Sequence, residues 1–135
     1  MLRNILIGVL LLGIIGICVG VYLWNKPHKK VEDAIGITIT AIALSKEYNT
    51  DEKKADTKYL NKAIEVSGTI SEVDKNQDGG LMVILQTDDP MAGVQCAMRD
   101  KNIVLSNGQN IIIKGFCSGN GITGVSLTDC VIKKP

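Results

Sequence analysis

One stretch limits the fold of this 135-residue chain more than any other, the run AIEVSGTISEV at residues 63–73. Its apolar residues Ile64, Val66 and Ile70 fall on one face at a period of two, and polar residues fill most positions between them. This pattern predicts a β-strand with one buried face. Gly68 interrupts the apolar row, and a glycine inside a strand often marks a sharp bend or a bulge. Such a feature suits a long strand that pairs in two sheets.

Four shorter strand-like runs follow, separated by turn residues. They cover residues 81–87, 93–98, 109–117 and 125–132. Asp78-Gly79 marks the first turn, and SGNG at residues 118–121 is expected to form the last one. Residues 99–105 are short enough for one or two helical turns. One long strand, four shorter ones and a brief helix between the third and fourth predict a mainly β protein, a five-stranded OB-fold barrel at residues 62–135.

A helical extension at residues 31–61 is expected to precede the barrel. Residues 31–40 are compatible with a short extended piece or with the start of a helix. Thr40 is expected to cap a helix through AIALSKEYN, and Thr50 a second helix through DEKKADTKY. The residues expected to face inward are Ile42, Ala43 and Leu44 of the first helix, and Ala55 and Tyr59 of the second.

The N-terminus predicts a single transmembrane helix. Residues 5–24 carry no charge over about the length that a helix needs to cross a bilayer. Tyr22 and Trp24 lie where interfacial aromatic residues are common. We therefore expect an anchor at residues 1–25 that crosses a membrane through residues 5–24, followed by a basic linker at residues 26–30.

The anchor is expected to be retained. No A-x-A-like cleavage site is present, and Ile17 stands before Cys18, where a lipoprotein signal requires a small residue. Counting basic residues on either side of the span slightly favours a cytoplasmic domain. In contrast, three cysteines in the predicted strands of a small domain favour an oxidising compartment.

Several runs carry a family resemblance: YLNKAIEVSGTISEV, LQTDDPMAGVQC, IIIKGFCSG and VSLTDCVI, together with the WNKPH linker. The chain resembles the tRNA_anti-like OB-fold family of small membrane-anchored or exported bacterial proteins, found largely in Bacteroidetes. The resemblance covers nearly the whole chain. It implies the barrel, no assigned catalytic residues and no demonstrated tRNA binding. It also implies a single-pass protein of the inner membrane with its domain in the periplasm.

Charge argues against binding to a phosphate backbone. The chain has 15 lysines and arginines, of which four lie in residues 1–30, so residues 31–135 carry 11 of them against all 14 acids, a net charge of −3. The domain's aromatic residues are Tyr48, Tyr59 and Phe116, and the two tyrosines are expected to pack between helices. The only histidine, His28, lies beside the anchor, so the sequence predicts no catalytic triad and no zinc site.

Two motifs are better explained by turns than by ligands. Residues 119–124 read G-x-G-x-x-G, but a strand follows instead of the helix that a dinucleotide site requires. Residues 74–79 read D-x-N-x-D-G, the first half of a calcium loop, but Leu85 occupies the place of the bidentate glutamate. We therefore predict a hairpin and a β-turn, with no metal and no cofactor.

The three cysteines of the domain allow three pairings. If SGNG is a tight loop, Cys117 faces Ile122 and Cys130 faces Gln109, which disfavours a Cys117–Cys130 bridge. The third and fifth barrel strands are parallel neighbours in an OB-fold, which places Cys96 and Cys130 at similar heights. A Cys96–Cys130 disulfide and three reduced, buried thiols remain the two alternatives.

Taken together, these features predict a non-enzymatic, membrane-tethered binding or scaffolding module whose ligand is a protein or an oligosaccharide. The alternative is a protein that binds single-stranded nucleic acid. The ligand is expected at the face framed by two loops, through Lys75, Asn76, Gln77 and Asp78 of the first and Ser118, Asn120 and Thr123 of the second.

Overall fold

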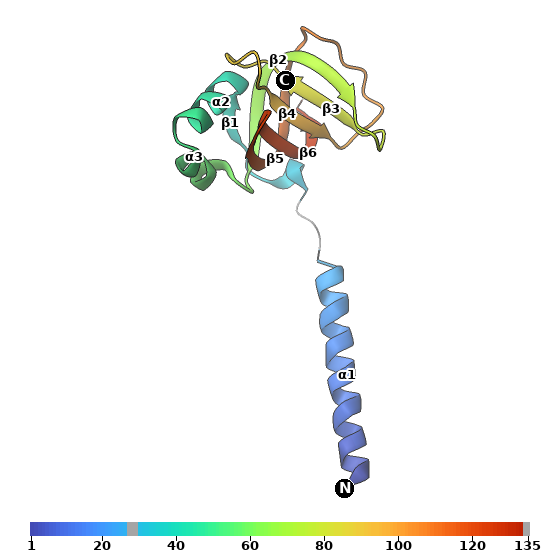
Figure 1. Ribbon diagram of the computed structural model, residues 1–135. Coiled ribbons are helices and arrows are strands. Elements are labelled where there is room, and N and C mark those ends of the chain that lie inside the picture. The colour runs from blue at the N-terminus through green and yellow to red at the C-terminus, as the bar shows by residue number, and fades with distance from the viewer. Residues whose placement is uncertain (27–29, 134–135) are drawn as a thin grey trace.

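The computed structural model describes residues 1–26 and 30–133, so residues 27–29 of the predicted basic linker lie outside the described residues. An apolar helix is followed by a β-barrel with two helices at its side (Figure 1). The elements are α1 (Leu2–Trp24), the 3₁₀ turn η1 (Val31–Asp33), β1 (Ile37–Thr40), α2 (Ala41–Thr50), α3 (Glu52–Tyr59), β2 (Ala63–Lys75), β3 (Leu81–Leu85), β4 (Val94–Met98), β5 (Asn110–Gly121) and β6 (Gly124–Ile132).

The five strands β2 to β6 close into the predicted OB-fold barrel. Their order is β2-β3-β4-β6-β5, and β5 returns to pair with β2. The long strand β2 serves two neighbours, as expected: residues 63–69 pair with β5 and residues 70–75 pair with β3. β1 adds a sixth strand, parallel to the start of β2. The undecided segment at residues 31–40 therefore holds both a 3₁₀ turn and a strand.

Gly68 allows a close approach of other elements and does not mark the register shift. A Cβ atom at this position would lie 3.1 Å from the Ala41 Cβ and 3.4 Å from the Leu85 Cβ. The register of β2 against β3 instead shifts between Ile70 and Glu72. The missing side chain thus lets the start of α2 and the end of β3 meet over the middle of β2.

The helix caps are partly as predicted. Thr40 caps α2, because its Oγ1 accepts a hydrogen bond of 3.1 Å from the Ala43 N–H. The prediction that Thr50 caps the next helix is wrong. Asp51 caps α3 by accepting a bond of 3.1 Å from the Lys54 N–H, while the Thr50 hydroxyl donates back to the Lys46 carbonyl.

The inward faces of the helices are also partly as predicted. Leu44, Ala55 and Tyr59 are buried as expected. Ile42 was expected to face inward, but 46% of it is exposed. Ala41, Leu44 and Tyr48 form the buried stripe of α2 at helical spacing, and Ile42 lies outside this stripe.

The predicted helical turns at residues 99–105 are absent from the structure, which has bends and irregular chain there. The Asp100 carboxylate accepts a hydrogen bond of 2.9 Å from the Asn102 N–H, a local turn that competes with helix formation. Ile103 and Leu105 then pack against the barrel core. This segment therefore covers one end of the barrel without a helix.

The last hairpin turns later than predicted. Ser118 to Gly121 continue β5, and the two-residue turn is Ile122-Thr123, flanked by the paired Gly121 and Gly124. Cys117 consequently lies opposite Leu127 instead of Ile122. The expected pairing of Cys130 with Gln109 is wrong as well, since β6 reaches only as far as Ile113 of β5.

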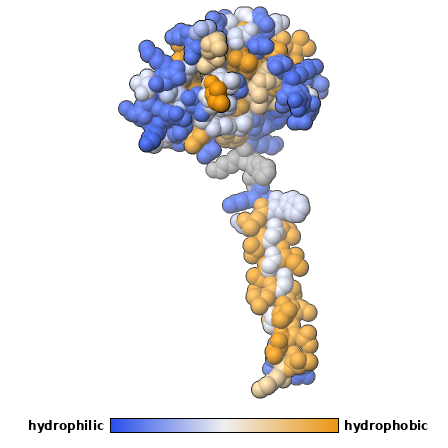
Figure 2. Space-filling model, in the orientation of Figure 1, coloured by the Kyte–Doolittle hydropathy of each residue, from blue (hydrophilic) through white to orange (hydrophobic). Residues whose placement is uncertain are grey.

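α1 is long and apolar enough to cross a membrane, and none of its residues is buried. Figure 2 shows its apolar surface, in contrast to the mostly hydrophilic surface of the barrel. After the linker the chain is held against the barrel. Val31 is fully buried, and the Arg99 guanidinium bridges Glu32 and Asp129.

Candidate binding groove

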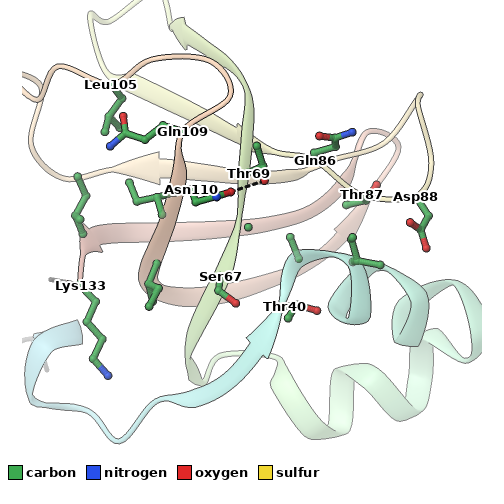
Figure 3. Close-up of a pocket in the computed structure, with 16 residues that line it drawn as sticks. Thr40, Ser67, Thr69, Gln86, Thr87, Asp88, Leu105, Gln109, Asn110 and Lys133 are labelled. Carbon is green, nitrogen blue, oxygen red and sulfur yellow. Dashed lines mark hydrogen bonds between the residues drawn. The ribbon is translucent and has the colours of Figure 1, made fainter. Parts of the chain in front are cut away.

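An open groove of about 810 Å³ lies on the outer side of β2 and β5 (Figure 3). It lies between the start of α2, the segment before β5 and the end of β6. Its lining residues are Thr40, Ala41, Ile42, Ser67, Gly68, Thr69, Gln86, Thr87, Asp88, Leu105, Gln109, Asn110, Ile111, Ile112, Ile132 and Lys133.

Strand pairing sets the floor of the groove. Ser67 lies opposite Ile112 and Thr69 opposite Asn110 in the β2–β5 ladder, so these side chains share one face. The Thr69 hydroxyl donates a hydrogen bond of 2.7 Å to the Asn110 amide oxygen. The alternate residues of the same strands, such as Ile113, point into the core. The floor is therefore a rigid sheet with hydroxyl, amide and aliphatic side chains.

A cation lies at one end of the groove. The Lys133 ammonium is 2.7 Å from a carboxylate oxygen of Glu65, and the Lys114 ammonium is 4.0 Å from the other oxygen. The hydrogen bond from Lys133 lowers the pKa of the Glu65 carboxyl, and the positive charge of Lys114 acts in the same direction. Half of the Lys133 side chain stays exposed, while Glu65 is largely covered.

A carboxylate lies at the other end of the groove. Figure 3 shows Asp88 on the side of the groove opposite Lys133, with Ser67 and Asn110 between them. Asp88 and the neighbouring Asp89 are both exposed. Within residues 1–26 and 30–133, neither has a basic group within 4.0 Å. The groove is therefore polarised, with a positive and a negative end and a neutral middle.

The two loops predicted to frame the ligand face lie at opposite ends of the β3–β4 pair. β3 begins at Leu81, beside the end of β2, and Met82 lies opposite Ala97 near the end of β4. In contrast, Thr123 accepts a hydrogen bond of 2.6 Å from the Gln95 side chain near the start of β4. The two loops therefore lie at opposite ends of this strand pair.

The individual loop residues mostly serve the turns or the strands. Lys75 ends β2, and Asn76, Gln77 and Asp78 are exposed in the β2–β3 turn. The Asn76 side chain closes this turn by accepting a hydrogen bond of 2.7 Å from the Gly80 N–H. Ser118 and Asn120 belong to β5, since the hairpin turns later than expected.

The outer face between these loops is acidic. Cross-strand pairing puts one row of side chains from β2, β3, β4 and β6 on the outside of the barrel. The row consists of Glu72, Asp74, Met82, Ile84, Gln95, Ala97 and Ser126. It contains two carboxylates and no basic or aromatic side chain, whereas OB-folds that hold single strands use rings and a basic groove there.

The aromatic residues of the helices are packed away from the surface. Tyr48 and Tyr59 are buried, with ring centroids 6.3 Å apart, as the sequence predicted. The Tyr48 hydroxyl lies 3.3 Å from the Cys117 sulfur. Burial and this contact raise the pKa of Tyr48 far above its ordinary value. Neither ring is available to stack on a ligand.

The three cysteines of the barrel are free, buried thiols. The neighbouring Cys130 thiol, together with burial, raises the pKa of Cys96. The parallel β4–β6 register puts Cys130 opposite Met98 and shifts between Cys96 and Met98. The Cys96–Cys130 bridge stays a prediction.

The strand order and closure define an OB-fold barrel, which an apolar N-terminal helix precedes. The chain belongs to the tRNA_anti-like family, which matches residues 1–131. A search of curated proteins finds no significant match.

Two solved structures are similar in fold. One is a "putative nucleic acid-binding lipoprotein" from Klebsiella pneumoniae, with 19% sequence identity and a TM-score of 0.58 over 81% of this chain and 100% of that one. The other is the asparaginyl-tRNA synthetase of Entamoeba histolytica in complex with asparaginyl-adenylate. It has 13% identity and a TM-score of 0.45 over 76% of this chain and 25% of that one. At 19% identity the likeness to the Klebsiella structure shows the fold alone.

Sequence reasoning missed the groove because its residues come from five separate segments. One sequence signal could have indicated it. Ile112 stands inside an apolar triplet, where period two requires one isoleucine to face outward. Ile42, expected in the core, lies on the groove instead.

Proposed function

We propose that this protein is a non-enzymatic, membrane-tethered binding module that holds a protein ligand in the groove over β2 and β5. The groove is the observation that carries the proposal. Its hydroxyl, amide and aliphatic side chains match the mixed polar and apolar surface of a polypeptide. None of its lining residues is aromatic, which makes a sugar ring or a nucleobase a poorer fit.

The non-enzymatic part of the proposal rests on chemistry. The groove is lined by one carboxylate, Asp88, and one amine, Lys133, and these lie at opposite ends. General acid–base catalysis needs such groups within hydrogen-bond reach of the same reacting atoms. The sole histidine of the chain is at position 28, before the barrel.

Tethering rests on α1. Its 23 residues exceed the roughly 20 that a membrane-spanning helix requires. We place the barrel on the periplasmic side of an inner membrane, in line with the family resemblance and with the lipoprotein nature of the Klebsiella relative. A short tether then keeps the groove close to the membrane surface.

Site-specific photo-crosslinking in native membranes tests the groove. Gln86 on the groove and Gln77 in the β2–β3 loop are both exposed glutamines, so crosslinking from these two positions compares the groove with the predicted loops. A photo-crosslinking amino acid in place of Gln86 is expected to give a discrete protein adduct, whereas the same residue in place of Lys53 on α3 is expected to give none. Adducts from position 77 alone would move the site to the predicted loops. No adduct from either position would contradict the proposal.

Single-strand nucleic-acid binding is the second candidate, because the Klebsiella relative bears that description. The acidic row around Glu72 and Asp74 opposes it. We expect the full chain in detergent to give no gel shift with single-stranded DNA or RNA at low salt, where phosphate contacts are strongest. A shift that weakens steeply as salt is added would establish the second candidate in place of the first.

A further inference from the structure

The groove is lined by one charged side chain at each end, Lys133 at one and Asp88 at the other. At the Lys133 end two lysines, Lys114 and Lys133, share the single carboxylate of Glu65. Lys133 presents its positive charge at the surface, since its side chain is half exposed while that of Lys114 is only 12% exposed. At the other end the exposed Asp88 is negative. A ligand that lies along the groove therefore meets a cation at one end and an anion at the other.

The distance between the ends corresponds to a few residues of extended chain. Glu65, which contacts Lys133, and Thr69 are four residues apart on β2, or about 13 Å. The Thr69 carbonyl accepts a hydrogen bond of 2.8 Å from the Gln86 N–H, two residues before Asp88. An extended peptide along β2 would thus place residues about four or five positions apart at the two ends.

The cationic end adjoins the segment that comes from the membrane. The Lys114 ammonium donates hydrogen bonds to the main-chain carbonyls of Glu32 and Ala34. Six residues separate Trp24 at the end of α1 from the buried Val31. Even fully extended, this stretch covers only about 25 Å. In a tethered molecule the Lys133 end therefore lies near the bilayer, and the Asp88 end lies farther along the groove.

We propose that the groove binds the juxtamembrane segment of a neighbouring membrane protein in extended form. This inference rests on the function proposed above. An acidic residue of the segment meets Lys133 close to the membrane, and a basic residue four or five positions farther out meets Asp88. Uncharged residues between them contact Ser67, Ile112 and Asn110. Charge order and membrane proximity select this segment over other extended chains.

Charge reversal in the full chain, reconstituted in nanodiscs, tests the charge order. The probes are labelled nine-residue peptides with an uncharged middle and two charged residues four apart: Glu with Lys, Glu with Glu, or Lys with Lys. The native protein is expected to bind the Glu–Lys peptide about three- to ten-fold more tightly than the other two. Lys133→Glu is expected to shift the preference to the Lys–Lys peptide, and Asp88→Lys to the Glu–Glu peptide.

Lys75→Glu, at the end of β2 and outside the groove, is the matched control and is expected to change no preference. The inference is overturned if both reversals leave the peptide ranking unchanged, or if all three peptides weaken equally. Asp88 is exposed, so its variant keeps the test valid even if Lys133→Glu misfolds.

The crosslinked adduct separates this inference from the proposed function. An adduct at position 86 that maps to the juxtamembrane segment of another membrane protein supports the inference. An adduct with a soluble protein or with a second copy of this chain leaves the binding function standing and overturns the juxtamembrane partner. The absence of any adduct contradicts the function itself.

Discussion

Replacing Gly124 with alanine is expected to lower the free energy of unfolding of the barrel by about 3 kcal/mol or more. Gly124 closes the β5–β6 hairpin with φ +114°, a conformation that residues with a side chain rarely adopt. A Cβ atom there would lie 2.1 Å from the Gly93 carbonyl oxygen, so main chain must move on one side or the other. Because Gly93 leads directly into β4, the disturbance reaches the β4–β6 closure of the barrel.

Denaturant unfolding followed by far-UV circular dichroism measures this effect. The single tryptophan, Trp24, ends α1 and reports poorly on the barrel. Gly121→Ala is the control, since its Cβ would come no closer than 3.8 Å to Gly124 and its φ is not positive. It is expected to cost less than about 1 kcal/mol. Equal effects of the two substitutions would show that the close contact with Gly93 is not the cause.

The same hairpin shows why some of the fold was not predictable from sequence. Between Gly115 and Gly124 the chain has four glycines, and both SGNG and the stretch around Ile122 accommodate a turn. Turn rules favour the polar SGNG, yet the chain turns at Ile122-Thr123 and leaves Ile122 fully exposed. The choice depends on the packing of Gly124 against Gly93, a contact between segments about 30 residues apart that local patterns do not contain.

The features set by local pattern were predictable. Alternation in β2 and the triplet at residues 111–113 identified the paired central strands, and the Thr40 cap located the start of α2. Residues 99–105 failed as a helix because a side-chain turn at Asp100 satisfies the backbone locally. The strands of the barrel are thus predictable from the spacing of apolar residues, while its turns depend on contacts that form only in the folded state.

The candidate site was less predictable than the fold, for a related reason. Binding was expected in loops, where function is often found. The groove instead lies on strand faces, where Ser67 and Thr69 have the pattern of an ordinary solvated side. Only their pairing with Asn110 and Ile112, some 40 residues later, gathers them into one surface. Pairing between distant strands, which a single sequence does not give, is therefore what forms the groove.

Ile112 and Ile113 are neighbours on β5, but substitution of the first is expected to affect binding and substitution of the second is expected to affect stability. Ile113 is fully buried between β2 and β6, so Ile113→Ala is expected to destabilise the barrel by about 2–5 kcal/mol through the cavity it leaves. Ile112 points into the groove and is partly exposed, so Ile112→Ala is expected to cost about 1 kcal/mol or less.

For ligand binding, we expect the larger effect from Ile112→Ala and the smaller effect from Ile113→Ala. Ile112→Ala is expected to weaken crosslinking from position 86 several-fold while unfolding stays near that of the native chain, because it removes ligand contact area and little core. Ile113→Ala is expected to bind normally at temperatures where it remains folded, since the groove surface is unchanged. Denaturant unfolding and crosslinking yield, measured on the same two variants, check both. Loss of adduct in proportion to loss of stability in both variants would show that the outer face of β5 has no binding role of its own.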